Sequence, residues 1–498
     1  MNKLAITILL IAIGSVASPS CAAEASFKHW RNAMKAAEDA RYKREFEKMR
    51  EILEAEVAEA QKLGPASSAE NTFWLAFAYE ELGKQDLALQ AYDAEIDRIG
   101  ANPTALKLQI LRGILLGHRA TVYGRLNQLD KALASANEGK TVLEQAAGKF
   151  HPELYDINMT IGRIHFFRIE FAEAETSLKA ALKLAQSGRS GSAGVGDSTS
   201  MGMVVFVTRP APYRIIRAAT DLGELYLLEK KYDEAEPLFK LAVENAHAFY
   251  PKDSLMQALP LGSLAEVELK RGERKQFVRD TDEIMRIFSK TRGIGIADVS
   301  PVWLRMEADL ADGSARATAD TVKRIASIYE FQNYDFEELP KGALKLAMVK
   351  GEADWKRGEL LQEALSSIAE GYRATEPVKA GIIYTEIANF NSAHGRAEVA
   401  DAMFQKAITS QQNVKDKALL IGVLGKIAEA KMAAGNKAEA LKYYHQVSVA
   451  MREKYGDDMR VADAMDAEAA IMKDAGQEQA AKDLQADAMK LRNKIVLK

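Results

Sequence analysis

The sequence predicts an all-α fold, a right-handed solenoid of tandem helix-turn-helix repeats. Two observations support this prediction: the pattern of residues 221–242, DLGELYLLEKKYDEAEPLFKLA, and the recurrence of that pattern along the chain. The segment reads as two short amphipathic helices joined by a polar turn. Gly223 and Ala235 are small, and Phe239 is bulky, so the two helices can cross closely with the aromatic ring filling the gap.

A small residue opens the second helix of most predicted units, and this position recurs about every 42 residues. Three units are degenerate, with a glutamate, a phenylalanine or a threonine at this position. The period predicts about eleven helix pairs from about Phe27 to the C-terminus. The opening positions are Glu45, Ala88, Ala132, Ala174, Ala235, Phe277, Thr318, Ala364, Ala400, Ala440 and Ala481.

Glycines are expected in the turns between the two helices of a unit, because glycine readily ends a helix and reverses the chain. The glycines assigned to such turns are Gly83, Gly272, Gly313, Gly358, Gly395, Gly435 and Gly476.

The spacing in residues 221–242, G-x2-Y followed by A-x3-F, resembles the tetratricopeptide repeat (TPR). The interval exceeds the usual 34 or so residues of that repeat, and in this respect the chain is similar to the long repeats of kinesin light chains and their bacterial relatives. The resemblance implies a scaffold that binds short peptide segments of partner proteins along a concave groove lined by the first helices.

The N-terminus has the layout of a secretory signal peptide over residues 1–23. Lys3 precedes an apolar run from Leu4 to Ile13, and small residues follow up to the expected cleavage between Ala22 and Ala25. We therefore expect a periplasmic or secreted protein. The alternative is a lipoprotein anchored through Cys21, which would give weak membrane anchoring. No later segment is apolar for long enough to predict a membrane span.

The helix-pair period divides the mature chain into an N-terminal array (27–186), central units (213–290) and a C-terminal array (291–498). An insertion rich in glycine and serine separates the first two at 187–212. It is interpreted either as a loop packed on neighbouring helices or as an element that adds a strand or an apolar plug to a partner. A hinge or a contact between sub-arrays is expected near 290–300.

Composition and motifs argue against several functions. The net charge is −3, without a long run of one sign, so the sequence shows no nucleic-acid footprint. Gly139-Lys140-Thr141 resembles the end of a phosphate loop, but Ala134 replaces the first glycine that such a loop requires. The histidines have no metal-ligand spacing, and no nucleophile elbow is present. We therefore expect no enzyme activity, no cofactor and no metal.

The predicted groove combines aromatic, guanidinium and polar side chains, a mixture typical of peptide-binding hot spots. For each aromatic residue the alternative is packing between helices, and for each arginine it is a solvated surface position. The groove candidates are Phe73, Phe77, Thr121, Arg125, Arg163, Phe166, Phe167, Arg217 and Glu224.

The predicted function is a non-enzymatic exported scaffold or adaptor that binds a protein or peptide segment. The alternative is a self-assembling structural component of an envelope complex, and a hydrolase whose site is assembled from distant helices is the third possibility. Polar residues of the last helix argue against end-to-end stacking, since they resemble a capping repeat; examples are Lys482, Asp483 and Lys490.

Overall fold

The computed structural model describes residues 21–187, 211–293, 300–349, 352–433 and 435–496. These residues form 23 helices and one two-stranded ribbon, β1 (Met348–Val349) paired antiparallel with β2 (Glu352–Ala353). The predicted all-α repeat fold is confirmed. The chain separates into two compact units, Met1–Phe249 (unit 1) and Tyr250–Lys498 (unit 2), and the division falls between two helix pairs.

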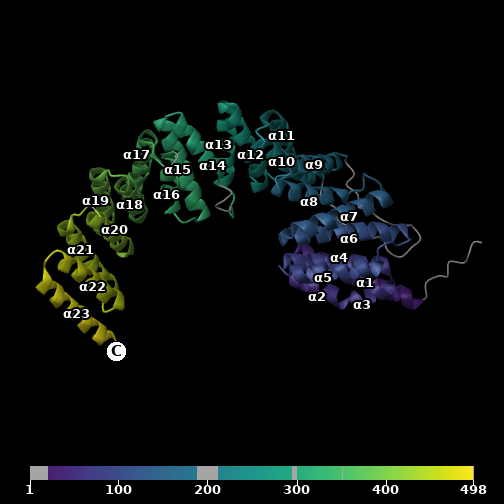
Figure 1. Ribbon diagram of the computed structural model, residues 1–498, viewed down its shortest axis with the longest axis horizontal. Helices are drawn as coiled ribbons and strands as arrows, with labels where there is room; N and C mark the ends of the chain where they lie inside the picture. The colour runs from purple at the N-terminus through teal and green to yellow at the C-terminus, as the bar shows by residue number, and fades with distance from the viewer. Residues whose placement is uncertain (1–20, 188–210, 294–299, 350–351, 434, 497–498) are drawn as a thin grey trace, which may run out of the picture. The chain divides into compact units, whose positions relative to one another are not determined.

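Unit 1 is a stack of five helix pairs with one additional short helix, α3, beside the first pair (Figure 1). Its helices are α1 (Cys21–Tyr42), α2 (Phe46–Ala55), α3 (Val57–Leu63), α4 (Pro65–Glu81), α5 (Gln85–Ile99), α6 (Leu106–Arg125), α7 (Leu129–Ala147), α8 (Leu154–Phe167), α9 (Phe171–Gln186), α10 (Ala211–Leu228) and α11 (Tyr232–Phe249).

Unit 2 continues the same alternation, with α16 as a short first helix before α17. Its helices are α12 (Leu255–Arg271), α13 (Arg274–Phe288), α14 (Ser300–Ala311), α15 (Ala315–Gln332), α16 (Glu338–Lys345), α17 (Trp355–Tyr372), α18 (Pro377–Ala393), α19 (Ala397–Gln411), α20 (Ala418–Ala433), α21 (Lys437–Tyr455), α22 (Met459–Asp474) and α23 (Glu478–Val496).

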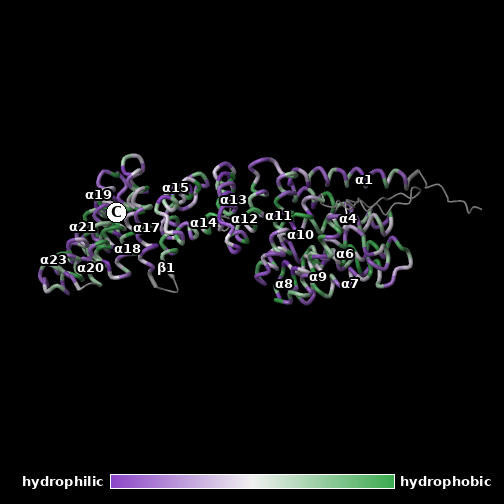
Figure 2. The backbone as a smooth tube through the Cα atoms, turned by 90° about the horizontal axis from the view of Figure 1, so that it is seen from above, coloured by the Kyte–Doolittle hydropathy of each residue, from purple (hydrophilic) through white to green (hydrophobic). Residues whose placement is uncertain are grey.

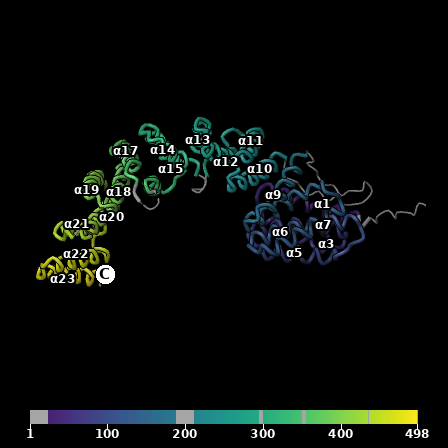
Figure 3. The backbone as a smooth tube through the Cα atoms, turned by 45° about the horizontal axis from the view of Figure 1, so that its top comes forward, coloured from purple at the N-terminus to yellow at the C-terminus, as the bar shows by residue number. Residues whose placement is uncertain are grey.

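Small residues lie where helices approach most closely. A Cβ atom added at Gly223 of α10 would lie 2.7 Å from Cε1 of Phe239, which is fully buried on α11. A Cβ at Gly162 of α8 would lie 2.8 Å from Leu178 of α9. The pairing of a glycine with a bulky side chain therefore fixes the crossing in each pair, as the sequence pattern predicts. Figure 3 shows the successive pairs of each unit.

The tripeptide Gly139-Lys140-Thr141 lies inside α7, and its glycine has a packing role. A Cβ at Gly139 would lie 2.9 Å from the carbonyl oxygen of Gly113 on α6, a backbone atom that cannot turn aside. Leu116 is also close, since its Cβ would be 3.0 Å away. The glycine is thus required by the approach of two helix backbones, which explains the motif without a phosphate.

The repeats that lack the small residue are helix pairs like the other repeats. Phe277 and Thr318 are fully buried on the second helices α13 and α15, at the position where other units carry alanine. The coloured backbone in Figure 2 shows that the helices contain both hydrophobic and hydrophilic residues. Burial of one face is what stabilises helices of this length.

Residues with a left-handed backbone conformation follow the first helices. The glycines assigned to these turns adopt this conformation with one exception. Six of the assigned glycines have positive φ, between 67° and 81°. Gly358 does not: it lies within the first turn of α17, which starts after the N-cap Asp354, so its assignment to a turn was wrong. In unit 1 the equivalent turn between α8 and α9 places Ile169 at φ 62°, a conformation that disfavours β-branched residues.

Three predictions fall mainly on residues outside those described. They are the signal peptide (1–23), of which only 21–23 belong to α1, most of the insertion (187–212), and part of the segment 290–300. Helix α10 begins at Ala211, before the expected end of the insertion.

A buried carboxyl in unit 1 makes stability depend on pH. Glu70 of α4 is 5% exposed, and burial raises its pKa to about 7 although Arg31 donates a hydrogen bond to it at 3.3 Å. Between pH 4.5 and about 7 the folded chain then binds more protons than the unfolded chain, so the free energy of unfolding should fall as pH rises.

We expect Glu70→Gln to remove this fall, worth about 2–3 kcal/mol for unit 1 between pH 5 and pH 8. Denaturant unfolding of both proteins at the two pH values measures the difference. An equal pH dependence in the variant and the wild type would contradict the assignment.

Candidate functional site

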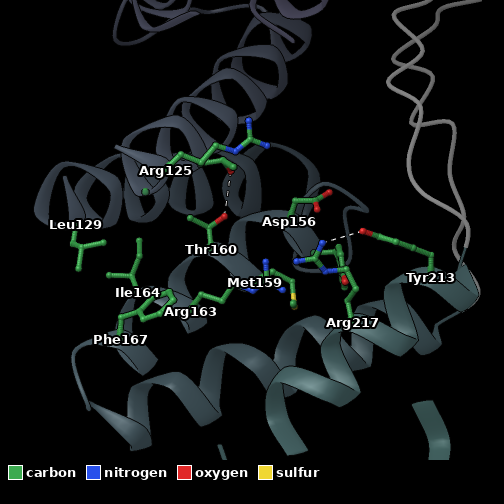
Figure 4. Close-up of a pocket in the computed structure, with 13 residues that line it drawn as sticks. Arg125, Leu129, Asp156, Met159, Thr160, Arg163, Ile164, Phe167, Tyr213 and Arg217 are labelled. Atoms are coloured by element: carbon green, nitrogen blue, oxygen red, sulfur yellow. Dashed lines mark hydrogen bonds between the residues drawn. The ribbon is translucent and has the colours of Figure 1, made fainter. Parts of the chain in front are cut away.

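A pocket of about 400 Å³ opens in unit 1 between the first helices α6, α8 and α10, with one residue of α7 at its rim (Figure 4). Its wall combines guanidinium, carboxylate, hydroxyl, aromatic and aliphatic groups. The lining residues are Thr121, Gly124, Arg125, Leu129, Tyr155, Asp156, Met159, Thr160, Arg163, Ile164, Phe167, Tyr213 and Arg217.

Helix α8 provides the central wall of the pocket. Asp156, Thr160, Arg163 and Phe167 follow one another at intervals of three or four residues, so they form one stripe along the helix. The opposite face of the helix, with residues such as Ile161, is buried against the rest of the unit. Burial of that face therefore orients the polar stripe toward the pocket.

Three arginines contribute guanidinium groups, and each has a positioning contact. Arg163 donates from Nε to Asp221 at 2.5 Å. Arg125 donates from Nη1 to Glu80 of α4 at 2.6 Å.

Arg217 donates from Nη1 to the hydroxyl of Tyr213 at 2.9 Å. Burial lowers the pKa of Arg217, whereas the hydrogen bond with Tyr213 raises it, and the pKa is raised overall. This side chain therefore stays charged. A guanidinium has five N–H donors, and each of these contacts uses one of them, so further donors remain for an acceptor in the pocket.

Two further contacts tie the helices of the site together. The hydroxyls of Thr121 on α6 and Thr160 on α8 lie 3.3 Å apart (Figure 4). The buried hydroxyl of Tyr155 donates to the carbonyl oxygen of Arg214 on α10 at 3.0 Å, and burial raises its pKa. The pocket is therefore preformed by contacts between successive first helices.

The apolar part of the wall is open to solvent at one end. Phe167 is 72% exposed at the C-terminal end of α8, and the apolar lining also includes Met159, Ile164 and Leu129. An exposed aromatic side chain next to guanidinium groups can pack on an apolar group of a ligand.

The structure brings five of the nine groove candidates together in this pocket: Thr121, Arg125, Arg163, Phe167 and Arg217. The other four lie elsewhere.

Phe73 is 7% exposed, and its ring packs edge-on against Trp74 and His118 at centroid distances of 4.9 and 4.6 Å. Phe77 packs against the core of the first helix pairs, with its ring 6.2 Å from that of Phe46. Both aromatics therefore serve packing between helices, the alternative weighed for them.

Phe166 and Glu224 are also outside the pocket lining. The Phe166 ring packs near those of Phe167 and Phe171, at 6.1 and 6.3 Å between centroids. Glu224 is exposed on α10. Phe166 and Glu224 lie on first helices, as the repeat predicts, but neither side chain lines the pocket.

The sequence reasoning missed Tyr155, Asp156, Met159, Thr160 and Tyr213. For Asp156, Met159 and Thr160 a signal was present, because they precede Arg163 at helical intervals on α8. Tyr213 lies in the first turn of α10, at the first residue of the range assigned to the central units, and no pattern singled it out.

In the parts of the chain that the structure describes, no three His, Cys, Asp or Glu side chains gather into a group that could hold a metal ion. The helices described there include none with the length and apolar character needed to cross a membrane.

Among protein families, curated proteins and solved structures, only solved structures are similar to this chain. No family model matches the sequence, and no curated protein matches it. Among solved structures, a TPR protein from Parabacteroides merdae has a TM-score of 0.36 and 18% identity, covering 64% of this chain and 98% of that one.

Two other solved structures are similar to this chain. A putative kinesin light chain from Podospora anserina with nearly identical TPR-like repeats has a TM-score of 0.35 and 15% identity, covering 44% of this chain and 94% of that one. The quorum sensor NprR from B. thuringiensis has a TM-score of 0.39 and 12% identity, covering 78% and 87%. The predicted alternation of paired helices is present in the structure itself, and we draw nothing about family or ligands from these likenesses.

Proposed function

We propose that this protein is a non-enzymatic scaffold that holds a peptide segment of a partner protein in the unit 1 pocket, with an acidic side chain as the anchor. The observation that carries the proposal is the grouping of Arg125, Arg163 and Arg217 around a preformed hollow with an apolar rim. Carboxylates are the acceptors that fit guanidinium donors best, since both groups are planar and can pair through two hydrogen bonds.

The pocket has the features of a binding site rather than of a solvated surface. Its helices are held in place by the contacts of Thr121 with Thr160 and of Tyr155 with α10, so a ligand does not have to order them. Phe167 at the rim offers a large apolar surface for the residue next to the anchor. An extended segment with an acidic and an aliphatic residue side by side therefore matches the wall.

We also propose that the scaffold acts in the periplasm or outside the cell. Support comes from the sequence alone, where Lys3, the apolar run and the small residues up to Ala25 follow the order of a signal peptide. Partners would then be envelope or secreted proteins. Mass spectrometry of the N-terminus of the exported protein measures the cleavage site, and an uncleaved chain that remains in the cytoplasm would contradict the proposal.

A peptide titration tests the binding proposal. The probe is an N-acetylated, C-amidated octapeptide in which three glutamates alternate with three leucines between terminal glycines. We expect Arg163→Gln combined with Arg217→Gln to weaken its binding to the full chain about tenfold, because two charged donors are lost. Isothermal titration calorimetry gives the dissociation constant.

The matched control is Lys28→Gln combined with Lys35→Gln, which changes the net charge equally at exposed positions of α1. It should bind the acidic octapeptide as the wild type does. The single variant Arg163→Gln, at a side chain that is 38% exposed, guards against a folding defect. If the arginine variants bind the acidic octapeptide as tightly as the control, the pocket is not the site.

A further inference from the structure

Unit 2 contains a second pocket, of about 460 Å³, formed by the first helices α12 and α14 with the C-terminal end of α16. Pro301 packs on Gly262 so closely that a Cβ at Gly262 would lie 2.8 Å from its Cγ. Phe288, which is 1% exposed, contributes to the buried part of the lining. Leu259, 44% exposed, lies on the open side. The hollow is therefore built by packed helices and is apolar in its interior.

The charged side chains of this pocket are negative, whereas the unit 1 pocket contains positively charged guanidinium groups. Its charged lining residues are Glu266, which follows Gly262 by one helical turn on α12, and Glu307, which follows Trp303 by one turn on α14. Within the described parts of the chain, neither carboxylate has a hydrogen bond or an ion pair. Neighbouring carboxylates of the same unit, such as Asp309 and Asp282, are paired with arginines.

Trp303 adds a second feature that suits a cation. Its indole lines the pocket and is held by α16 and α15: a Cβ at Gly342 would lie 3.1 Å from the ring, and the ring of Tyr329 is 6.3 Å away edge-on. Tryptophan is the aromatic residue that attracts ammonium and guanidinium groups most strongly. The indole of Trp303 and the carboxylates of Glu266 and Glu307 therefore line the same pocket.

We propose that this unit 2 pocket binds a lysine or arginine side chain of a peptide segment, with an adjacent aliphatic residue against Leu259 and Pro301. The cation would pair with Glu266 and Glu307 and lie near the indole of Trp303. This site is separate from the pocket of unit 1, and the proposal does not depend on what that pocket binds.

The test uses a basic octapeptide identical to the acidic probe except that lysines replace the glutamates. We expect Glu266→Gln combined with Glu307→Gln in the full chain to weaken its binding about tenfold and to leave binding of the acidic octapeptide unchanged. The single variant Glu307→Gln, at an exposed side chain, should weaken binding of the basic peptide about threefold and keeps the test valid if the double variant unfolds.

The matched control is Glu363→Gln combined with Glu398→Gln, which changes the net charge equally at exposed positions of the second helices α17 and α19. Its affinity for the basic octapeptide should stay within about twofold of the wild type. Equal weakening in this control would mean that the peptide follows net charge alone, and unchanged binding in the Glu266 and Glu307 variants would mean that it binds elsewhere. Either result overturns the proposal.

Discussion

Phe239→Ala is expected to lower the free energy of unfolding of unit 1 by about 3–5 kcal/mol. The side chain is fully buried between α10 and α11, and its ring lies where a Cβ at Gly223 would come within 2.7 Å of Cε1. Removing the ring leaves a cavity at the crossing of two helices. Denaturant unfolding of the full chain, followed by circular dichroism, measures the loss.

Phe249→Ala on the same helix is the matched control, because that phenylalanine is 40% exposed, and we expect a loss of about 1 kcal/mol or less. A second comparison uses Gly223→Ala, which should destabilise the wild type by about 1–3 kcal/mol through overpacking. In the Phe239→Ala background it should be tolerated, since the added methyl group enters the cavity. Additive effects of the two substitutions would contradict the proposed contact.

Asp309→Asn is expected to destabilise unit 2 by about 3 kcal/mol or more, since it removes a buried charge that pairs with two arginines. Asp309 is 1% exposed, and both its oxygens accept from Nε of Arg305, at 3.1 and 3.0 Å. It also accepts from Arg274 at 2.6 Å and from the hydroxyl of Thr321 at 2.7 Å. The network joins α13, α14 and α15, so its loss should reduce the cooperativity of these three helices.

The control for this prediction is Asp312→Asn, at a carboxylate that bonds the same Arg274 at 2.8 Å but is 53% exposed. Exposed pairs contribute little, so a loss of about 1 kcal/mol or less is expected. Thermal unfolding monitored by calorimetry compares the two variants. Similar melting temperatures for Asp309→Asn and Asp312→Asn would show that burial does not set the strength of this network.

The repeat could be predicted from the sequence because each helix pair is stabilised by local rules that recur. Gly223 and Phe239 show the rule in its clearest form, and the buried Phe277 and Thr318 show that the period holds where the small residue is lost. The assignment of Gly358 was wrong because a glycine in a sequence does not state its φ, and here Asp354 caps the helix before it.

Some of the residues named as groove candidates line the pocket of unit 1. Arg125, Arg163 and Phe167 were found from their place in the repeat, because that place sets the face of the helix. Phe73 lies earlier in its own first helix, and it packs against His118, a residue of the next pair that the repeat pattern does not specify. Residues of neighbouring helix pairs decide which side chains on one face of a helix remain accessible.

The sequence by itself determined the all-α class, the alternation of helices and the small residues at their crossings, since these depend on side chains close together in the chain. Only the tertiary structure decided which polar groups meet across helices: the guanidinium groups around one pocket, Glu266 and Glu307 in another, and the buried Asp309 between two arginines. The physical reason is that these contacts join residues of different helices, and their geometry follows from packing rather than from spacing along the chain.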